Sequence, residues 1–345
     1  MILIVTPIES YEENKSSFVA CATVIQTLSE DWNRAQKLVR LDQGEFQDLL
    51  TVVRPSIEQT TTRGTLRQRQ VKKTSLSPFD IVFLTLFWLA HYPTLAFISS
   101  FFSLHEREVT RVLKQTLAGM ASALQQEIQW PTEEEFVQHQ NNMAYFHNWN
   151  FADIACVIDG TEIRVARPKT WDKQKILWSG KKHQHSLNVL FITRLDGIII
   201  YYSPYRVGAH DQSHWNELNL RSKFVGSSFG ICGDGGFTFN RKQDQEEIIG
   251  YKPYKKPKNG TLTEEQKQYN KRLSQMRVIV ENTIARVKQW KILKGTFRHY
   301  HEDKDQLDLN QILTVVVALT NRNIRKTPLR RSTWTAANWN DIFMP

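Results

Sequence analysis

Three acidic residues follow or interrupt apolar segments at positions where a reactive site is often found. Asp159 closes the apolar run Ile154–Ile158, which predicts a buried strand, and Asp234 closes a shorter run at 229–232. Glu281 lies in the middle of a long segment with helical periodicity. Since carboxylates at the ends of two central strands lie at one mouth of a sheet, we expect these three acids to converge.

Carboxylates that converge on one spot repel each other unless hard cations lie between them. Oxygen ligands select Mg²⁺ or Mn²⁺, and two such ions can clamp the attacking and leaving oxygens of a phosphoryl transfer. The sequence therefore predicts a site for two ions at Asp159, Asp234 and Glu281. Each acid alone has a plainer explanation, because glycine follows both aspartates as in turns and Glu281 can pair with a basic neighbour.

Two basic residues share the helical face of Glu281. Arg277 lies four residues before it and Lys288 seven residues after it, so all three form one polar strip beside the apolar stripe. Arg suits bidentate contact with phosphate, and Lys acts as a point charge. We expect Arg277 and Lys288 to hold the phosphates that flank the reacting one.

The elements around these acids predict a mixed α/β layer fold. Apolar runs at 154–158, 186–193, 198–205 and 229–232 predict strands, and Asp196-Gly197 predicts a hairpin turn between the second and third. Two helices are expected at 264–292 and 309–324. The first of them has a core stripe of apolar residues at steps of three and four: Leu273, Met276, Val280, Ile284 and Val287.

The preceding part of the chain predicts helices alone. One begins after Asp42 and ends at Pro55, and a basic linker follows it. Helices at 79–91, 94–102 and 106–124, with a tight turn before the last, match the helix-turn-helix outline. In that reading Arg107, Arg111 and Lys114 face the major groove of DNA, and the alternative is a plain helical bundle.

The charge of the 345-residue chain is +10, and most of the surplus is local. Residues 241–298 hold 15 basic and 6 acidic residues, and a second basic cluster lies within 63–73. A confined basic surface favours a polyphosphate partner such as nucleic acid, although acidic membranes or proteins would also fit. Lys255 and Lys256 lie in a basic loop that we expect to grip DNA.

Other features exclude several classes of protein. The longest apolar stretch, 81–90, is too short to span a membrane, and the N-terminus lacks the pattern of a signal peptide. Three cysteines without a CxxC pair indicate a reducing compartment. His210 and His214 have zinc-peptidase spacing, but no third ligand follows them. For Trp290, near the end of the predicted helix, we expect packing in the core and not stacking on a nucleic-acid base.

The motifs taken together resemble the DDE transposases of the PIF/Harbinger type and their bacterial relatives in the insertion-sequence-5 group. The order and spacing of the matching pieces make the resemblance specific over about residues 40–325. Its matching pieces are Ile158-Asp159-Gly160-Thr161, Gly208-Ala209-His210-Asp211, Gly233-Asp234-Gly235-Gly236-Phe237, and the stretch from Asn270 to Lys288 that keeps Arg277, Glu281 and Lys288 in register.

The resemblance implies an RNase H-like mixed sheet flanked by helices and preceded by an all-α helix-turn-helix domain. Its catalytic triad falls on Asp159, Asp234 and Glu281, and Asp211 is a secondary candidate, either a ligand or a residue that orients the site. The expected division is 1–75 helical segment and basic linker, 76–130 helix-turn-helix, 131–150 linker, 151–325 catalytic domain and 326–345 tail.

The resemblance also implies the activity and partners of the chain. We expect a transposase that cuts transposon ends and joins them to target DNA with two Mg²⁺ or Mn²⁺ ions. The alternatives are a transposase-derived DNA-binding protein and a nuclease that cuts without joining. The implied partners are double-stranded DNA and a second copy of the chain, with a Myb-like protein added if the host is eukaryotic. The expected location is then the nucleus, and otherwise the cytoplasm with the nucleoid, without secretion.

The basic surface makes a prediction about salt. Because phosphate contacts release condensed counterions, we expect the affinity of the chain for DNA to fall steeply as salt is raised. Fluorescence anisotropy with a labelled duplex over a salt series measures the slope. A flat response would contradict the assignment of the basic clusters to DNA.

Overall fold

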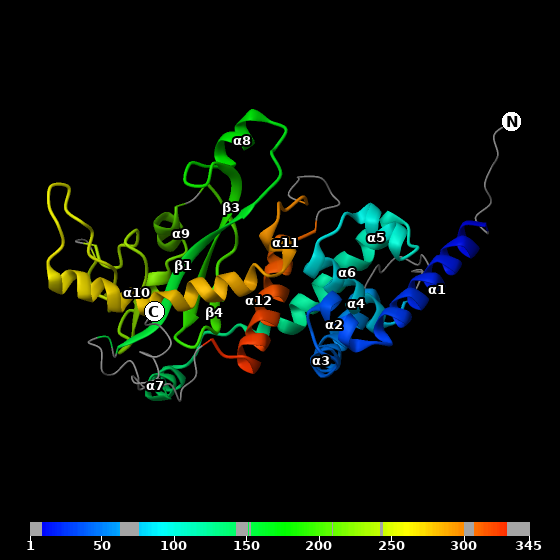
Figure 1. The fold of residues 1–345 in the computed structure, drawn as a ribbon, viewed down its shortest axis with the longest axis horizontal. Coiled ribbons are helices and arrows are strands. Elements are labelled where there is room, and N and C mark those ends of the chain that lie inside the picture. Colours follow the sequence, from blue (N-terminus) through cyan, green and yellow to red (C-terminus); the bar gives the residue numbers. More distant parts are fainter. Residues whose placement is uncertain are drawn as a thin grey trace. The chain divides into compact units, whose positions relative to one another are not determined.

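The computed structural model describes residues 9–62, 76–142, 151, 153–208, 210–241, 244–299 and 307–329. The chain divides into two compact units, which are described separately (Figure 1). The first unit comprises residues 1–126 and 289–316, and the second comprises 127–288 and 317–345. The basic cluster within 63–73 and most of the predicted tail lie outside the described residues.

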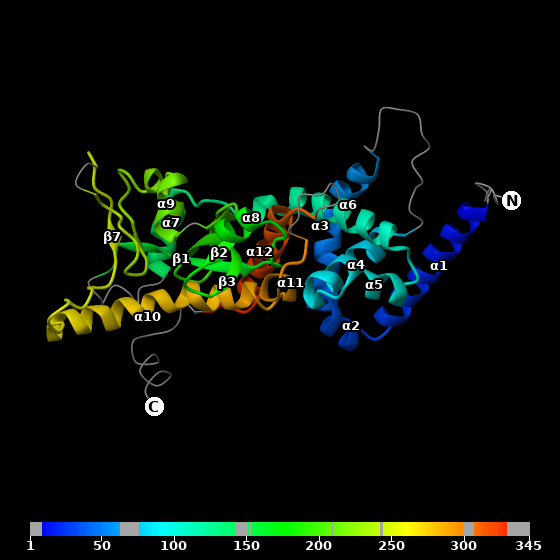
Figure 2. The ribbon, with the colours of Figure 1, turned by 90° about the horizontal axis from the view of Figure 1, so that it is seen from above.

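Helices make up the first unit, as the sequence predicts for its N-terminal part (Figures 1 and 2). The three helices that were expected to form the helix-turn-helix outline begin and end within one residue of their predicted bounds. The helices of this unit are α1 (Glu9–Ser29), α2 (Trp32–Val39), α3 (Gln43–Thr62), α4 (Pro78–His91), α5 (Leu95–Phe101), α6 (Glu106–Leu124) and α11 (Lys291–Lys294), with the first turns of α12 (Leu309–Lys326).

Side chains define where α4 and α5 begin. Ser77 and Asp80 form a capping box at α4, in which the Asp80 carboxylate accepts the Ser77 backbone N–H at 2.9 Å. Thr94 caps α5 by accepting the Phe97 N–H at 3.1 Å. The five apolar residues expected on the inner face of α6 are all buried: Val109, Val112, Leu113, Leu117 and Met120. The three predicted helices are thus confirmed.

The prediction that Pro55 ends a helix is wrong. Helix α3 continues through Pro55 to Thr62. Its second half packs against α6, where a Cβ on Gly119 would stand only 2.9 Å from the Ile57 Cα. A proline removes one backbone hydrogen bond from a helix. The buried contact of Ile57 with α6 compensates for that loss, and no local sequence signal reports it.

Residues 289–316 belong to the helical unit, although the predicted catalytic segment includes them. Arg298 anchors this stretch, because its guanidinium donates to the backbone oxygens of Tyr92 at 2.7 Å and Pro93 at 2.9 Å. The Phe297 ring also stacks on Tyr92. These contacts join residues that are far apart in the sequence, so the periodicity of one segment does not predict them.

A seven-stranded mixed sheet forms the centre of the second unit. The strands run in the order β2-β3-β1-β6-β7, and β4 and β5 also pair with β3. Strand β1 is antiparallel to β3 and parallel to β6. The strands are β1 (Ile154–Arg164), β2 (Trp178–Ser179), β3 (Gln184–Arg194), β4 (Ile199–Tyr202), β5 (Arg206–Val207), β6 (Gly230–Cys232) and β7 (Gly250–Tyr251).

The four predicted strands are present, but β1 is longer than expected. It pairs with β3 from Cys156 opposite Arg194 to Arg164 opposite Ser186. Asp159 therefore lies in the middle of β1 and not at its end. The predicted turn at Asp196-Gly197 joins β3 to β4, and Gly197 takes the positive φ of 93° that favours glycine.

Helices cover the sheet of the second unit. Helix α10 (Glu264–Val287) lies along the sheet beside β1 and β3 (Figures 1 and 2), and all five residues of its predicted stripe are buried. The others are α7 (Glu133–Asn142), α8 (Trp171–Leu177), α9 (Asp211–Glu217), the short 3₁₀ helix η3 (Leu220–Lys223) and the last turns of α12. None of the described helices has the length and apolar character needed to cross a membrane.

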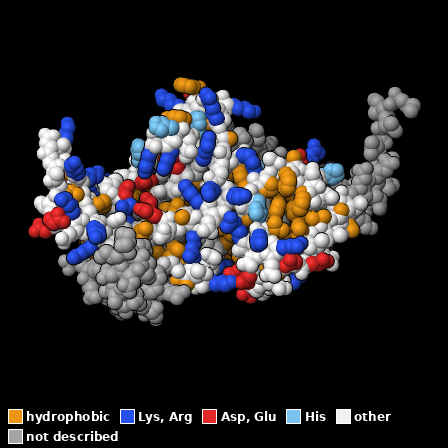
Figure 3. Space-filling view, in the orientation of Figure 1, with side chains coloured by type: hydrophobic (Ala, Val, Ile, Leu, Met, Phe, Trp, Pro, Cys, Tyr) orange, Lys and Arg blue, Asp and Glu red, His pale blue; other side chains and the backbone are white. Residues whose placement is uncertain are grey.

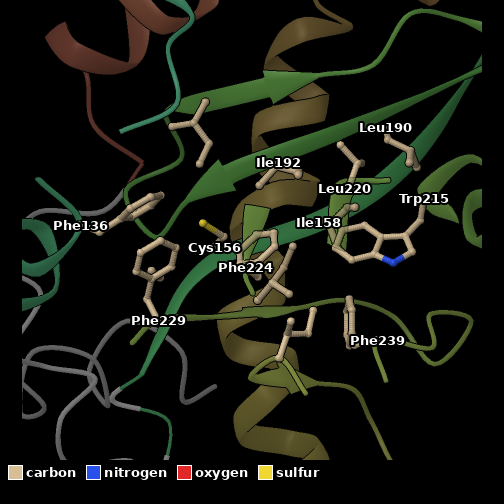
Figure 4. Packing of buried hydrophobic residues seen from close by; sticks show 14 of the residues in the cluster. Phe136, Cys156, Ile158, Leu190, Ile192, Trp215, Leu220, Phe224, Phe229 and Phe239 are labelled. Atoms are coloured by element: carbon tan, nitrogen blue, oxygen red, sulfur yellow. The ribbon is translucent and has the colours of Figure 1, made fainter. Parts of the chain in front are cut away.

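The core of this unit lies on the face of the sheet that meets α9 and η3. Figure 4 shows strand residues such as Ile158 and Leu190 packed against aromatic side chains that include Trp215 and Phe224. Phe136 of α7 is also fully buried there. The stretch 131–150, which the sequence predicts as a linker, therefore contains a helix held by the core, because Phe136 has an apolar partner in Phe229 at 4.2 Å between ring centroids.

Substitution of Gly119 tests the contact between α3 and α6, and substitution of Gly44 serves as the control. Replacing Gly119→Ala should destabilise the protein by about 1 to 3 kcal/mol, because the new Cβ meets the Ile57 backbone. Gly44→Ala, in the first turn of α3 with an ordinary 3.5 Å contact, should be neutral or slightly stabilising. Chemical denaturation of both variants measures the difference. Equal free energies of unfolding would refute the close approach of the two helices.

Candidate active site

The Asp159 carboxylate lies in the middle of the central strand β1 and accepts the Gly160 N–H at 2.9 Å. Its pKa is raised to about 6, mainly by burial and in part by the nearby carboxylates of Asp211 and Asp234. The Gly160 hydrogen bond and the Arg277 guanidinium oppose this rise in the pKa. Asp159 is therefore an acid whose ionised form is costly until a cation approaches it.

Asp234 lies two residues beyond the end of β6, the strand that runs parallel to β1. It is half-buried, and its Oδ1 accepts the Gly236 N–H at 2.8 Å. The side chain is close enough to Asp159 to raise the pKa of that residue. The two aspartates that the sequence singles out thus lie within electrostatic range of each other.

Glu281 does not join these two carboxylates directly. Its side chain is 54% exposed on α10, and its Oε1 lies 3.6 Å from Nη2 of Arg277. In the ranges that the structure describes, no three His, Cys, Asp or Glu side chains lie close enough together to hold a metal ion. The helix acid is connected to the strand acids through Arg277.

Arg277 lies between the acids of the strand and the acid of the helix. Its side chain is 18% exposed, and it both pairs with Glu281 and lowers the pKa of Asp159. Its buried Nε has no hydrogen-bond partner among the described residues. Since a buried donor without an acceptor is costly, this N–H is available to an anionic ligand.

Lys288, the second predicted phosphate contact, lies against β1. Its Nζ donates to the backbone oxygen of Glu162 at 3.0 Å. Burial lowers the pKa of Lys288, and nearby Lys182 lowers it further, whereas Glu162 and Asp159 raise it. The ammonium is therefore half-buried beside the acids and partly engaged with the strand.

Asp211, the secondary metal candidate, is the first residue of α9 and lies behind β1. A Cβ on Gly160 would overlap its carboxylate, so the space of the missing side chain is filled by Asp211. Neighbouring residues of a strand point to opposite faces, and Asp211 thus occupies the face opposite the Asp159 side chain. Burial raises the pKa of Asp211, and a hydrogen bond from Asn188 lowers it.

A series of hydrogen bonds between polar side chains holds Asp211 in place. The Asn188 amide nitrogen donates to Oδ1 of Asp211 at 2.8 Å, and the amide oxygen lies 3.1 Å from Nδ1 of His214. Burial lowers the pKa of His214 to about 4, so the ring is neutral and donates through Nδ1. The histidine pair does not form a zinc site, because His214 is buried against Asn188 while His210 is exposed.

Sequence reasoning missed two residues of this region, Asn188 and Glu162. Asn188 interrupts an apolar strand, which is a signal that could have been used. Glu162 accepts hydrogen bonds from Ser179 at 2.8 Å and Ser186 at 2.7 Å. It lies two residues beyond Gly160 on the same face of β1. Its position depends on how β1 pairs with β3, and the sequence of one segment does not show that pairing.

The remaining predicted DNA contacts are divided between the two units. In the helical unit Arg107 is exposed and Lys114 is half-exposed, whereas Arg111 is engaged by Glu108 and Gln115. In the sheet unit Lys255 and Lys256 are exposed, and Lys255 lies beside Gly235, next to Asp234. Trp290 is buried in the helical unit, as predicted.

A comparison with protein families decides what this arrangement is. Residues 158–321 match the model of the DDE superfamily endonucleases, a range that includes the three predicted acids. This part of the chain, called the DDE domain below, is similar to those endonucleases. The resemblance to DDE transposases is thereby confirmed. The three predicted acids lie on β1, after β6 and on α10.

A curated relative supports the same family. Over 146 residues the chain is 31% identical to a protein of Microchaete diplosiphon described as a probable transposase for insertion sequence element IS702. The match covers 42% of this chain and spans about half the length of that relative. No solved structure is significantly similar to the chain.

The raised pKa of Asp159 predicts how the stability of the DDE domain depends on pH. From its ordinary value of 3.8, the pKa rises to about 6 in the folded state, so folding becomes less favourable as pH increases between these values. Asp159→Asn keeps the acceptor for Gly160 and removes this cost. In EDTA at pH 8 it should stabilise the protein by about 1 to 3 kcal/mol, and below about pH 4 the gain should vanish.

Urea unfolding at several pH values measures this effect. Glu246→Gln, at an exposed carboxylate in a loop of the same unit, serves as the control and should show no such trend. A destabilised Asp159→Asn protein at pH 8 would contradict the burial of an unfavourable charge at this position.

Proposed function

We propose that the chain is a DDE transposase that cuts transposon ends and joins them to target DNA by metal-dependent phosphoryl transfer. The observation that carries the proposal is the electrostatic proximity of Asp159 and Asp234 within the region that matches the DDE endonucleases. The curated relative is described as a probable transposase, which supports the same role. The whole activity is a proposal because the match covers only part of each chain.

We further propose that the sheet unit is an RNase H-like domain. What supports this is the central position of β1, which lies between antiparallel β3 and parallel β6. Asp159 on β1, Asp234 beyond β6 and Glu281 on the covering helix α10 are the proposed catalytic residues. Helices α4, α5 and α6 are the proposed DNA-reading domain, with Arg107 and Lys114 toward the major groove.

The donor chemistry of the site fits hard divalent cations. Asp234 disfavours the charged form of Asp159, so a cation beside Asp159 would relieve a cost that the folded protein bears. Two Mg²⁺ or Mn²⁺ ions, held by Asp159, Asp234 and Glu281, would activate the attacking oxygen and neutralise charge on the phosphate. Asp211 is proposed as a positioning residue, since it contacts Gly160 from the opposite face of the sheet.

Arg277 has a specific role in this proposal. Its unpartnered Nε binds a phosphate of the DNA strand, and the guanidinium then shares its charge between that phosphate and Asp159. The 3.6 Å pair with Glu281 is half-exposed and weak, so its loss releases the Glu281 carboxylate toward the aspartates. Substrate binding thereby completes the acidic site.

The proposed partners follow from the same surfaces. Double-stranded DNA, as transposon ends and as target, contacts Arg277, Lys288, Lys255 and Lys256. Two copies of the chain pair two ends, and a Myb-like protein assists if the host is eukaryotic. In the two alternatives, the chain binds DNA without cutting it or cuts it without joining.

A strand-transfer assay with a Mg²⁺ buffer and transposon-end DNA tests the proposal. Asp159→Asn and Glu281→Gln should each reduce cleavage by on the order of 10²-fold or more while DNA binding is retained. Glu264→Gln, an exposed acid in the first turn of the same helix α10, is the matched control and should cut normally. Unchanged cleavage by the first two variants would reject the triad.

The products distinguish the alternatives. Joined products from the wild-type chain support a transposase, whereas nicked ends without joined products favour the nuclease. Binding without any cleavage favours the transposase-derived DNA-binding protein.

A further inference from the structure

The segment 164–185, here called the arm, exposes aromatic rings among basic residues. Within the described chain eight large apolar side chains are exposed, and three of them lie in the arm: Trp171 at 74%, Ile176 at 56% and Trp178 at 47%. Figure 3 shows hydrophobic side chains at this place, over α8, with Lys and Arg around them. Exposed tryptophan is unfavourable in water and therefore indicates a binding surface.

The charge of the arm indicates what it binds. Its residues include seven Lys and Arg and one acid, Asp172. Arg164, Lys169, Lys175, Lys181 and Lys182 are all exposed. The centre of a protein–protein interface is depleted of lysine, whereas basic residues interleaved with aromatic rings suit a nucleic-acid strand.

The two tryptophans are held on an anchored segment. The Trp178 ring packs edge-on against His185 and His183, with 5.3 Å and 6.4 Å between centroids, and about half of its surface stays exposed. Next to it, Ser179 donates a hydrogen bond to Glu162 of β1 at 2.8 Å, and Leu177 is buried. The arm therefore presents its rings from a fixed position on the sheet.

The lysines of the arm lie near residues of the candidate active site. Lys181 lies near enough to Asp211 to lower the pKa of that carboxyl, and Lys182 lowers the pKa of Lys288. The basic charge of the arm therefore adjoins that of Lys288.

From these observations we infer that the arm binds DNA that has unpaired bases, by stacking them on Trp171 and Trp178 while its lysines contact the phosphates. A base inside a duplex has no free face for stacking, so the arm distinguishes a frayed or single-stranded end from a blunt duplex. The inference rests on one part of the proposed function, that the partner is DNA. It does not require that the chain cuts DNA.

The test is equilibrium binding by the full chain carrying Asp159→Asn, in EDTA, followed by fluorescence anisotropy. The probes are a duplex of about 20 base pairs with blunt ends and the same duplex with a 3′ extension of about five nucleotides. We expect tighter binding to the extended probe. Trp171→Ala and Trp178→Ala should each weaken that binding by about 5- to 100-fold, with less than about twofold change for the blunt duplex.

Two further variants are controls. Trp171→Phe keeps an aromatic face and should restore most of the preference for the extension. Val137→Ala removes an apolar side chain that is 43% exposed on α7 of the same unit and should leave the preference unchanged. Circular dichroism melts verify that each exposed substitution leaves the fold intact.

Three outcomes would overturn the inference. One is equal binding of both probes by the wild-type chain, and another is an equal loss for both probes in the tryptophan variants. The third is a change in self-association of these variants by sedimentation without a change in DNA binding, which would assign the arm to a protein partner. If the wild-type chain never cuts DNA but the preference depends on the tryptophans, the proposed function fails and the arm inference stands.

Discussion

The burial of one carboxylate, that of Asp159, is the constraint on which the rest of the DDE domain depends. A carboxyl in the middle of a central strand, with Asp211 and Asp234 nearby, resists ionisation. The surrounding groups each offset part of this cost: the Gly160 N–H, the Arg277 guanidinium and the ammonium of Lys288. The site is thus prepared for positive charge, and the apolar core on the other side of the sheet keeps it in place.

Arg277 connects two elements that otherwise have separate roles. The strand supplies fixed acids, because β1 is paired on both sides, while the half-exposed Glu281 on α10 is free to change its partner. An arginine four residues before Glu281 can reach both. This arrangement makes the third acid depend on what the arginine binds, so substrate and metal would assemble the site together.

Local patterns were sufficient to predict the helices α4, α5 and α6, the strands β1, β3, β4 and β6, and the buried stripe of α10. Capping residues, apolar runs and the Asp-Gly turn act over a few residues, so one sequence contains them. The continuation of α3 past Pro55, the helix within 131–150 and the place of Asp211 depend on contacts between distant segments. Strand ends predict that Asp159, Asp234 and Glu281 converge, but Glu281 contacts Arg277 instead of the two aspartates. The full length of β1 is not predicted either, because pairing with β3 sets it.

Gly160 has a consequence for how such chains lose activity. Its hydrogen atom leaves the space that Asp211 occupies, so a single added methyl group would displace that carboxylate and disturb the strand beside Asp159. Under the proposed function, a descendant with alanine here would retain all three acids in its sequence and still be unable to cut DNA. An intact set of acids would then not be sufficient evidence of an active enzyme, and residue 160 would have to be compared as well.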